Sequence, residues 1–571
     1  MIHGNIRMNR LGSVMKTNCP EFGGHHVRRS QDLGGSTGYQ GPEFQEFRPK
    51  ENLQTRCDPG SLLYDWVLPL IAVVCLVASC LLVSPKKELW VDEGYSLRVL
   101  TDKSLYHAMY AITRGVDGGM PLYYLVAYLW AKVFGTSLLA LRLFSCFGIC
   151  AGAVVLWKTM SGIYSRVGVA VGVLSAVITS TLVLTQNVEI RYYGLFFASA
   201  AIVLAAHRRL VQQAAGSKPV LPAIVAHGAL VMSHPLGVLY SGVAILALLA
   251  SDRRNHALRP GLYAGLCASW LTILVWIRPI LHIYDIGRPH NWLVPPGLSE
   301  IINFFSISPF VPISILVSVC LAAVSTQARY DDERESSSGA MTLHAVGYVL
   351  VPIVVAITSW LLSPLFCDRY FLPSTLGAAI IVAHVVDSVL PGKRLVFSQR
   401  LGASVLILVM LIWPIWTSWR MPRDENFERL DRKLAIGVPV IVEDGNFFIP
   451  LSYYTQQRPS PYYYVLDWDT AWDSPSRHAT VQYKLMRNAK AAGYAKNRII
   501  ESRDALCGFD RFIVLDTPSI SWFEERVLLS RNFHVENIGH LGYPEPGPSN
   551  IWMVTRRYRS ADCGTSSGTG N

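Results

Sequence analysis

The stretch Glu88-Leu89-Trp90-Val91-Asp92-Glu93-Gly94-Tyr95, residues 88–95, follows directly on the first long apolar run of the chain, at about 62–83. A run of that length is close to the ~20 residues that cross a bilayer as a helix, so Asp92 and Glu93 are expected just beyond a membrane span. Adjacent carboxylates repel each other, and a nearby cation or a proton relieves the repulsion. The same pair would also suit an ordinary solvated loop, with the flanking aromatic residues in an interfacial belt.

The composition is that of a membrane protein. The 571 residues are 51% hydrophobic and only 16% charged, and the mean hydropathy is +0.30. A soluble protein of this length is less apolar. The net charge of +11 would suggest nucleic-acid binding in a soluble protein. In a membrane protein Lys and Arg instead mark cytoplasmic loops and lipid head groups, so no nucleic-acid partner is predicted.

The 11 cysteines are scattered, with no paired CxxC motifs and no CxxC combined with spaced histidines. This pattern argues against a zinc site and against a disulfide framework. Cys367 and Cys507 could both face an oxidising compartment, but the sequence does not show whether they pair.

Four segments of the chain differ in character. Residues 1–60 are polar and show no apolar period, which predicts a disordered cytoplasmic arm. Residues 61–420 predict a polytopic α-helical membrane domain with an outer loop at 84–120. Residues 421–560 predict a small α/β domain, and residues 561–571 a disordered tail.

The basic residues predict on which side of the membrane each loop lies. Twelve apolar runs occur between residues 62 and 419, and the one at 121–136 is short and opens with Pro121. Basic clusters, which mark cytoplasmic loops, lie at 158–166, 207–218, 253–259 and 393–400. With a cytoplasmic N-terminus, one crossing must return the chain between the first span and residue 158. The run at 121–136 is therefore expected to be partial, which leaves about eleven full crossings.

This topology brings ionisable residues from several loops to the outer face. They are Asp92, Glu93, the segment 189–193, His234, the loop 278–305 and Arg369. If the run at 121–136 crossed fully, the sides of the later loops would reverse and the convergence would be lost. Part of the outer loop, 95–114, has apolar residues at mostly helical spacing, which is typical of helices on a membrane surface. The odd number of crossings places the C-terminal domain outside the cytoplasm.

The C-terminal segment alternates short apolar strands with helices, which indicates an α/β fold. Strands are predicted at 438–442, 462–466 and 512–515, and helices at 480–492 and 521–529. Acidic groups at 443–446 and 467–469 follow two of these strands, where α/β folds often bind ligands. Such residues are more often simple turn residues. No phosphate-binding glycine loop is present.

Short motifs occur in a particular order along the membrane domain. They are Trp90-Val91-Asp92-Glu93, Pro121-Leu122-Tyr123-Tyr124, Ala140-Leu141-Arg142-Leu143, Glu189-Ile190-Arg191-Tyr192-Tyr193-Gly194, Ser233-His234-Pro235 and Asp368-Arg369-Tyr370-Phe371-Leu372-Pro373. In this order they resemble the GT-C class of membrane glycosyltransferases. The pattern is most similar to a bacterial branch with lipopolysaccharide galacturonosyltransferases, aminoarabinose transferases of lipid A and protein O-mannosyltransferases. Each motif alone is weak, but the ordered set, over about 62–420, is more specific.

The resemblance implies a transferase of the bacterial inner membrane. Such an enzyme moves a sugar from a polyprenyl-phosphate donor to a glycolipid, polysaccharide or protein on the outer face. By its position in the motif, Asp92 would be the catalytic carboxylate that deprotonates the acceptor, and Glu93 would support it. A single displacement of this kind inverts the anomeric configuration. No cofactor is implied, although some members of the class use a divalent cation.

Arg191, Arg369 and Tyr192 are the candidates to bind the donor phosphate. A guanidinium can bind two phosphate oxygens at once and stays charged at any relevant pH. Each arginine closely follows an acidic residue, Glu189 or Asp368. Structural ion pairs between these neighbours are therefore the competing interpretation.

Asp117, Tyr123, His234, Arg288 and His290 are the further candidates for substrate binding. The class often has His or a second Pro just before the Pro-Leu-Tyr-Tyr motif, and Asp117 stands in that region here, which leaves the substrate type open. His234 lies between two apolar runs, where an ionisable group is costly and usually functional, but a hydrogen-bonded structural histidine fits as well. Arg288 and His290 belong to a loop at 284–296 that has the composition of a substrate-facing lid or, equally, of a surface connection.

Two other functions fit parts of the sequence. A transporter or flippase of a lipid-linked or polar substrate often shows internal repeats and charges at the membrane midplane. No repeat is evident here, and the charges gather on one face. A non-catalytic membrane scaffold with an outer binding domain would tolerate replacement of Asp92, whereas a transferase that uses it as a base would not.

Overall fold

The computed structural model describes most of the chain from residue 62 to residue 558. The described residues are 62–212, 220–323 except 289, 292 and 307, 335–389, 397–424, 427, 430, 434, 437–454, 461–517, 520–541 and 549–558. The predicted arm at 1–60 and tail at 561–571 lie outside these residues.

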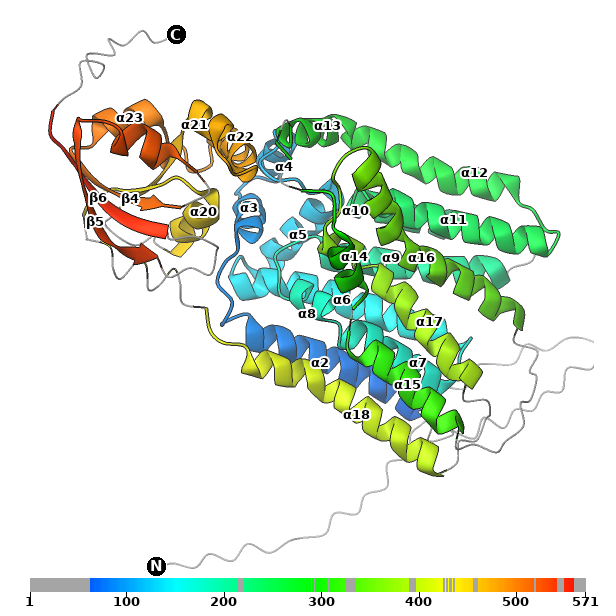
Figure 1. Cartoon of the computed structure of the whole chain (residues 1–571). Helices are drawn as coiled ribbons and strands as arrows, with labels where there is room; N and C mark the ends of the chain where they lie inside the picture. The colour runs from blue at the N-terminus through cyan, green and yellow to red at the C-terminus, as the bar shows by residue number, and fades with distance from the viewer. Residues whose placement is uncertain are drawn as a thin grey trace, which may run out of the picture. The chain divides into compact units, whose positions relative to one another are not determined.

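Helices make up the first and larger part of the structure (Figure 1). Those of the membrane region are η1 Leu63–Val67, α2 Leu68–Val83, α6 Leu138–Ser161, α7 Arg166–Val173, η2 Leu174–Ile178, α8 Thr181–Gln186, α9 Tyr193–Gln212, α10 Val220–Ser233, α11 Gly237–Arg254, α12 Pro260–Ala268, η3 Ser269–Trp276, α13 Ile277–Ile286, α14 Leu298–Phe305, α15 Phe310–Ala323, α16 Glu335–Leu361, η4 Asp368–Phe371, α17 Ser374–Val389 and α18 Phe397–Arg420. The first and last long helices, α2 and α18, pack side by side although they are far apart in sequence.

Several of these helices are long and apolar enough to cross a membrane. In the described part of the chain there are six: Leu63–Val83, Leu138–Ser161, Tyr193–Gln212, Pro260–Ile286, Ser338–Leu361 and Gln399–Arg420. A pair bent by 57°, Leu298–Phe305 with Phe310–Leu321, makes a seventh if it counts as one span. Shorter apolar helices are Arg166–Ile178, Val220–Ser233 and Ser374–Val389. The protein is a multi-pass membrane protein, and the total of eleven full crossings stays a prediction.

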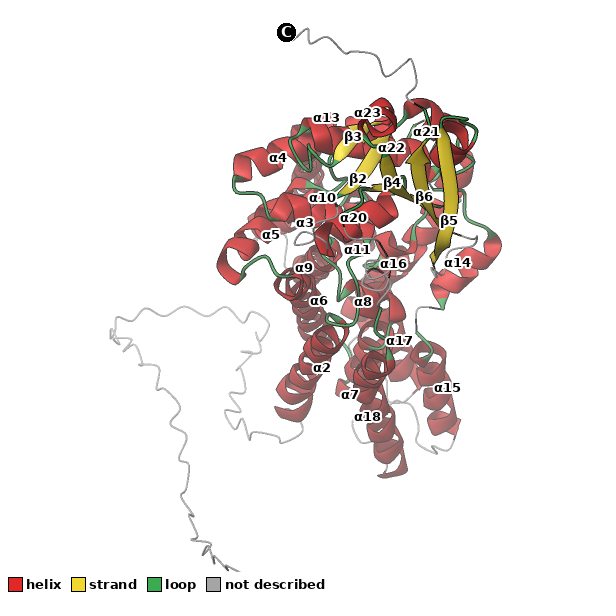
Figure 2. Ribbon diagram, turned by 90° about the vertical axis from the view of Figure 1, so that its left-hand side faces the viewer, coloured by secondary structure: helices red, strands yellow, loops and turns green. Residues whose placement is uncertain are grey.

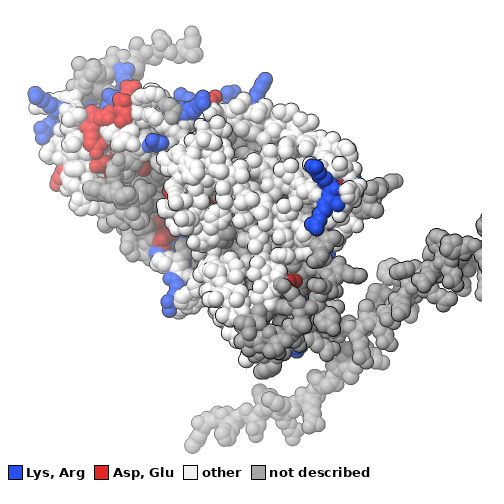
Figure 3. Space-filling view, turned by 45° about the vertical axis from the view of Figure 1, so that its right-hand side comes forward, with Lys and Arg blue, Asp and Glu red and all other residues white. Residues whose placement is uncertain are grey.

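The surface of the helical region agrees with a lipid environment. Figure 3 shows a broad face of this region with almost no charged side chains, while Lys, Arg, Asp and Glu gather towards the C-terminal domain and in a patch at the opposite side. Large apolar side chains such as Leu271, Leu274 and Val275 on η3 are exposed. In water such a surface would be costly, whereas lipid tails solvate it.

The outer loop at 84–120 contains two short helices, α3 (Val91–Leu100) and α4 (Leu105–Thr113). The Ser104 hydroxyl caps α4 by accepting a hydrogen bond of 3.3 Å from the His107 N–H. The following helix, α5 (Pro121–Phe134), has 14 residues, which corresponds to ~21 Å of length. A helix of that length is shorter than the ~30 Å hydrocarbon core, which agrees with a partial span.

Two glycines bring α6 and α9 into close contact. A Cβ atom on Gly194 would lie 2.2 Å from the Ser145 carbonyl oxygen, and one on Gly148 would lie 2.5 Å from the Gly194 carbonyl carbon. Both of these neighbours are backbone atoms, so a side chain at either position would force the helices apart. This approach fixes the segment before α9, residues 187–192, against α6.

The C-terminal part forms a mixed sheet with the strand order β3-β2-β1-β4-β6-β5 (Figure 2). The strands are β1 Val440–Val442, β2 Tyr462–Leu466, β3 Ile499–Glu501, β4 Arg511–Asp516, β5 Phe533–Leu541 and β6 Ser549–Arg556. The first four are parallel, and β6 and β5 extend the sheet in antiparallel register. The accompanying helices are α20 Gly445–Tyr454, α21 Trp468–Asp473, α22 His478–Ala491, α23 Ser502–Gly508 and η5 Phe523–Leu528. The α/β fold and three of its strands were predicted; β3, β5 and β6 were not.

The C-terminal domain contacts the outer helices directly. A Cβ atom on Gly94 in α3 would lie 2.1 Å from Cγ2 of Ile449 in α20, so the two helices touch at this glycine. The Leu89 N–H donates a hydrogen bond of 2.7 Å to the Tyr454 hydroxyl. Lys484 of α22 donates a hydrogen bond of 3.0 Å to the Asp285 carbonyl at the C-terminal end of α13, where a cation is favoured.

The acidic groups at the strand ends hold the C-terminal domain together. Glu443 follows β1 and is buried, and its carboxyl accepts hydrogen bonds from the Thr517 N–H at 3.2 Å and the Phe523 N–H at 3.1 Å. Asp444 accepts one of 2.9 Å from the Gln482 amide. Asp467 caps α21 and pairs with Arg526 at 2.9 Å. These contacts favour the interpretation as turn and cap residues.

Glu443 also belongs to a cluster of three acids with Asp516 at the end of β4 and Glu524 in η5. Burial, followed by the charge of Asp516, raises the pKa of Glu443 well above its usual range. Burial likewise raises the pKa values of Asp516 and Glu524, which interact with each other. The folded protein therefore keeps these carboxyls protonated at pH values where the unfolded chain has released the protons. These groups stabilise the fold fully below the ordinary carboxyl pKa, and this stabilisation is lost as the pH rises through their raised pKa values in the folded protein.

Asp516→Asn is expected to reduce this loss. The amide keeps an oxygen for the Trp552 indole N–H, which donates to Asp516 at 2.9 Å, and offers an N–H to the neighbouring carboxyls. Thermal unfolding of the purified protein at pH 6 and pH 9 checks this. We expect the wild-type melting temperature to fall with pH, and that of Asp516→Asn to fall less, by on the order of 2–4 °C. Equal slopes in the two proteins would contradict the assignment.

Candidate active site

A buried ion pair joins α6 to the start of α3. Arg142 is fully buried, and its Nε and Nη2 both donate to the Glu93 carboxylate at 2.9 Å. Its remaining donors bind the chain after the first span, with Nη1 at 2.7 Å from the Ser84 carbonyl and 2.9 Å from the Lys87 carbonyl, and Nη2 at 3.1 Å from the Glu88 carbonyl. All five N–H donors of the guanidinium therefore have acceptors.

The Glu93 carboxylate is equally well bound. Beyond Arg142, it accepts a hydrogen bond of 3.0 Å from the Ile190 N–H and one of 3.3 Å from the Trp90 N–H at the start of α3. Burial alone would raise the pKa of Glu93, but the charges of Arg142 and Lys87 and these hydrogen bonds lower it overall. Glu93 thus stays ionised inside the protein and fixes the segments on either side of it.

Asp92, the neighbouring residue, has a different environment. Its carboxylate lies 2.9 Å from Nη2 of Arg369, and the two side chains are 23% and 20% exposed. Asp368, the sequence neighbour of Arg369, makes no ion pair with it among the described residues. The competing interpretation, a structural ion pair between these neighbours, does not hold, because Arg369 pairs with Asp92 of the outer loop instead.

Arg191 binds the same region from another side. Its Nη1 lies 3.0 Å from both carboxylate oxygens of Asp117, 3.1 Å from the Ser96 hydroxyl and 3.2 Å from the backbone carbonyl of Asp92. The competing pair with Glu189 does not hold either, because Glu189 pairs with Lys87 at 3.0 Å. Two guanidiniums, from Arg191 and Arg369, thus converge on Asp92.

Asp117 is buried, and its contacts are with internal groups of the protein. Besides Arg191, its carboxylate accepts hydrogen bonds from the Ser96 hydroxyl at 2.8 Å, from the Gly118 N–H at 2.6 Å and from the Tyr124 hydroxyl. The structure therefore places the Asp117 carboxylate on the Arg191 guanidinium, which it holds in position. The substrate contact predicted for Asp117 is not seen in these internal contacts and stays a prediction.

Aromatic rings surround the two arginines. The Arg191 guanidinium lies 4.9 Å from the centre of the Tyr192 ring. That ring lies 6.0 Å from Tyr123 and 5.2 Å from His234, and His234 lies 5.0 Å from Tyr370, the neighbour of Arg369. His234 is buried and its Nδ1 accepts a hydrogen bond of 3.1 Å from the Leu236 N–H. Tyr123, Tyr192 and His234 thus belong to one aromatic cluster beside Arg191.

Arg288 and His290 lie elsewhere. Arg288 donates a hydrogen bond of 2.7 Å to the Tyr284 hydroxyl, and its backbone carbonyl accepts one from Lys484 of the C-terminal domain. The His290 ring lies 5.2 Å from Trp472 in α21. The loop at 284–296 therefore meets the C-terminal domain, which favours the interpretation as a connection; substrate binding by Arg288 and His290 stays a prediction, and Trp292 falls outside the described residues.

Comparison with known proteins identifies the fold. No family model and no curated protein matches the sequence. Among solved structures, ArnT from Cupriavidus metallidurans in the apo state aligns with a TM-score of 0.52 and 12% identity, over 87% of this chain and 98% of that one. The chain has a GT-C glycosyltransferase fold.

Two further structures align less well. ArnT from the same organism bound to undecaprenyl phosphate gives a TM-score of 0.37 at 12% identity, over 87% of this chain and 98% of that one. The Archaeoglobus fulgidus oligosaccharyltransferase in complex with Zn and sulfate gives 0.40 at 9% identity, over 78% of this chain and 68% of that one. A shared fold does not determine function, so the chemistry of this protein follows from its own residues.

Several residues of the site carry little or no signal in the sequence. Arg142 is the exception, because a lone arginine in an apolar run is costly and usually has a partner. Ser96 and Tyr124, which bind Asp117, gave no signal because Ser and Tyr are common in such sequences. Tyr370 follows Arg369 directly and could have been proposed from that position.

Within the described residues, no group of three or more His, Cys, Asp or Glu side chains is arranged to hold a metal ion. The GT-C resemblance left a divalent cation open, and that expectation stays a prediction. Cys367 is a free thiol, whereas Cys507 is disulfide-bonded, so these two cysteines do not pair with each other.

The buried ion pair predicts that replacing Glu93 costs much more stability than replacing the adjacent Asp92. Glu93→Gln leaves Arg142 buried without a counter-charge, so we expect a loss of about 3–5 kcal/mol in the free energy of unfolding. Asp92→Asn removes a partly exposed pair and is expected to cost about 1 kcal/mol or less. Unfolding of the two purified variants in the same detergent compares these losses.

A double variant supplies the control. Glu93→Gln combined with Arg142→Gln is expected to lose less stability than the sum of the two single changes, because either change alone leaves a charge unpaired. Additive losses, or a Glu93→Gln protein as stable as Asp92→Asn, would show that the pair does not anchor the site.

Proposed function

We propose that this protein transfers a sugar from a polyprenyl-phosphate donor to a hydroxyl group of an acceptor on the outer face of the membrane. The acceptor would be a glycolipid, a polysaccharide or a protein. The observation that carries the proposal is the partly exposed Asp92 on a GT-C fold: its carboxylate pairs with Arg369, and its backbone carbonyl accepts a hydrogen bond from Arg191. This combination offers a proton acceptor and two cations for a phosphate at one place.

Asp92 would act as the general base. Its carboxylate takes the proton of the acceptor hydroxyl while the oxygen attacks the anomeric carbon of the donor sugar. The bond from that carbon to the phosphate oxygen breaks, and polyprenyl phosphate leaves with the bonding electrons. Because attack and departure occur on opposite sides of the carbon, the product has the inverted configuration.

Arg369 and Arg191 would bind the phosphate in different ways. Arg369 is partly exposed and pairs with Asp92, so an arriving phosphate can take over its guanidinium. That exchange would leave Asp92 without its counter-ion and make it a better proton acceptor. Arg191 is held by Asp117, and its buried Nε has no partner among the described atoms, so it offers a fixed cation with a donor to spare.

Two observations support an outer-face site. Three of the basic clusters predicted to be cytoplasmic lie together, as loops on one side of a membrane should: Arg208 donates to the Thr159 carbonyl at 2.6 Å, and Arg259 to the Leu210 carbonyl at 2.9 Å. The disulfide at Cys507 favours an oxidising compartment for the C-terminal domain. Together with the likeness to bacterial ArnT, these observations favour the bacterial inner membrane with the C-terminal domain outside the cytoplasm.

The base assignment is tested with Asp92→Asn. We expect the variant to lose transfer by ~100-fold or more, because an amide cannot accept the proton. In membranes with equal protein levels, the polyprenyl-phosphate sugar should accumulate and an outer-face glycan should lack one sugar. Asp469→Asn, at a 79% exposed side chain of the C-terminal domain, is the matched control. Unchanged pools and glycans in Asp92→Asn would remove the base assignment and favour a transporter or scaffold.

The phosphate assignment is tested by binding. Arg369→Gln should weaken binding of polyprenyl phosphate about 10- to 100-fold, because it removes charge-assisted hydrogen bonds. Asp92→Asn should not weaken it. Arg531→Gln, at an exposed arginine of the C-terminal domain, controls for the lost charge. Equal affinity of Arg369→Gln and wild type would show that Arg369 does not hold the phosphate.

A further inference from the structure

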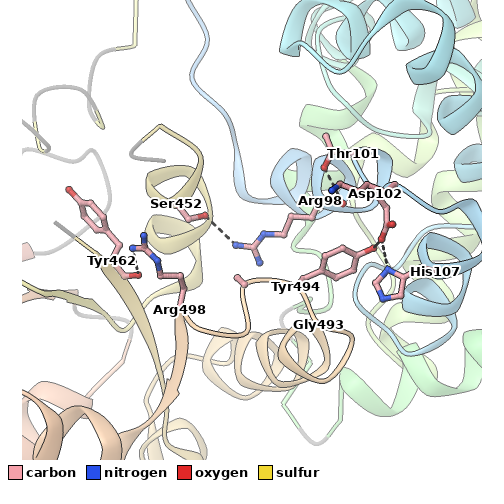
Figure 4. Close-up of a pocket in the computed structure, with 11 residues that line it drawn as sticks. Arg98, Thr101, Asp102, His107, Ser452, Tyr462, Gly493, Tyr494 and Arg498 are labelled. Atoms are coloured by element: carbon pink, nitrogen blue, oxygen red, sulfur yellow. Dashed lines mark hydrogen bonds and ion pairs between the residues drawn. The ribbon is translucent and has the colours of Figure 1, made fainter. Parts of the chain in front are cut away.

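A cavity lies between the outer helices and the C-terminal domain (Figure 4). Its volume is about 570 Å³, within the range of small-molecule sites. One wall comes from the end of α3 and the turn into α4, with Arg98, Asp102 and Lys103. The other comes from Ser452 in α20 and from Tyr494 and Arg498 in the segment before β3.

Three cations line this cavity, and none of them has an acidic partner among the described residues. Arg98 donates a hydrogen bond of 3.2 Å to the Ser452 hydroxyl, while its Nη1 is buried and has no acceptor. Arg498 donates a long hydrogen bond of 3.4 Å to the Tyr462 carbonyl, and its guanidinium lies 6.0 Å from the centre of the Tyr463 ring. Lys103 is exposed at the rim. Figure 4 shows the Arg98 guanidinium extending into the space between α3 and α20.

The acid in the cavity does not neutralise these cations. Asp102 accepts hydrogen bonds from the Ser104 N–H at 2.9 Å and the Tyr494 hydroxyl at 2.5 Å, and it also contacts the His107 ring. The hydrogen bond to Asp102 raises the pKa of His107. The negative charge of Asp102 is thus matched locally, and the three cations remain in excess.

A buried guanidinium without a counter-ion is unfavourable, and its unused N–H needs an acceptor. Arg98 also lies 5.6 Å from the Phe448 ring, which supplies a weak attraction but no hydrogen-bond acceptor. A neutral or cationic ligand would leave the excess charge in place. An oxyanion would neutralise the excess charge and accept a hydrogen bond from the free N–H of Arg98, because phosphate and carboxylate oxygens match the donor geometry of arginine.

We propose that this cavity binds an anionic group, a phosphate or a carboxylate, carried by the acceptor. The assignment to the acceptor rests on the proposed transfer reaction, whereas the anion binding itself does not. Arg98 and Asp92 belong to the same helix, about 9 Å apart along its axis at ~1.5 Å per residue. They leave the helix on different faces, so the cavity holds a part of the acceptor remote from the reacting hydroxyl.

Direct binding tests the cavity without turnover. Inorganic phosphate, glucuronate and the neutral control glucose are titrated into the purified full-length protein at constant ionic strength. At least one of the two anions should bind, and Arg98→Gln and Arg498→Gln should each weaken it by about tenfold or more. Arg498 is only half-buried, so its variant keeps the test valid if the change at Arg98 disturbs folding. Arg531→Gln and Asp92→Asn should bind like the wild type.

The outcomes are distinct. Binding of phosphate alone indicates a phosphorylated acceptor, and binding of glucuronate alone indicates an acidic sugar. The inference fails if neither anion binds better than glucose, or if both arginine variants bind like the wild type. Loss of transfer in Asp92→Asn, with normal anion binding in both arginine variants, would reject the cavity and keep the transferase. Unchanged sugar pools and glycans in Asp92→Asn, with anion binding lost in Arg498→Gln, would keep the anion site and remove Asp92 as the base.

Discussion

The ion pair between Arg142 and Glu93 is the constraint on which the rest of the site depends. It lies where no water reaches, so each of its donors and acceptors must be matched inside the protein, and each is. The acceptors come from the chain after α2 and from α3, and the carboxylate in turn holds the Ile190 N–H. Asp92 is adjacent to Glu93 and Arg191 to Ile190. Both reactive candidates are therefore positioned by bonds that their neighbours make.

The two adjacent acids show how one short helix serves both interior and surface. Successive residues of a helix point in directions about 100° apart, so Glu93 can face α6 while Asp92 faces Arg369. The buried acid and its partner are rigid because all their bonds are made. Asp92 and Arg369 are joined by a partly exposed salt bridge, in which a stronger anion can replace the carboxylate. A preorganised site requires both features: a rigid ion pair that holds the backbone, here Glu93 with Arg142, and a neighbouring ion pair that substrate can replace, here Asp92 with Arg369.

Much of the fold could be predicted because it depends on apolar periodicity. The membrane helices and the parallel strands β1, β2 and β4 appear as apolar runs in the sequence. Strands β5 and β6 have polar residues along much of their length and give a weaker signal. The short span α5 was indicated by Pro121 at its start and Gly135 after its end, where φ is +88°.

The partners of the charged residues could not be predicted in the same way. Sequence proximity suggested Glu189 for Arg191, whereas the fold supplies Asp117, 74 residues earlier. Such a choice depends on which helices touch, and a glycine contact such as that between Gly148 and Gly194 has no counterpart in a hydropathy pattern. The candidates near Asp92 were found because acids and arginines are rare in the membrane region. For Arg288 and His290 the sequence left two interpretations open, because a polar loop fits a lid and a domain contact equally well.

The order of the Arg142 contacts along the chain bears on how the protein is made. Each group that Arg142 binds, from the Ser84 carbonyl to the Glu93 carboxylate, precedes it in the sequence, Glu93 by 49 residues. During synthesis these groups leave the ribosome before the helix that carries the arginine. When α6 enters the bilayer, every partner of Arg142, its buried charged residue, has therefore already been synthesised. Neutralising this arginine requires no segment that has yet to be translated.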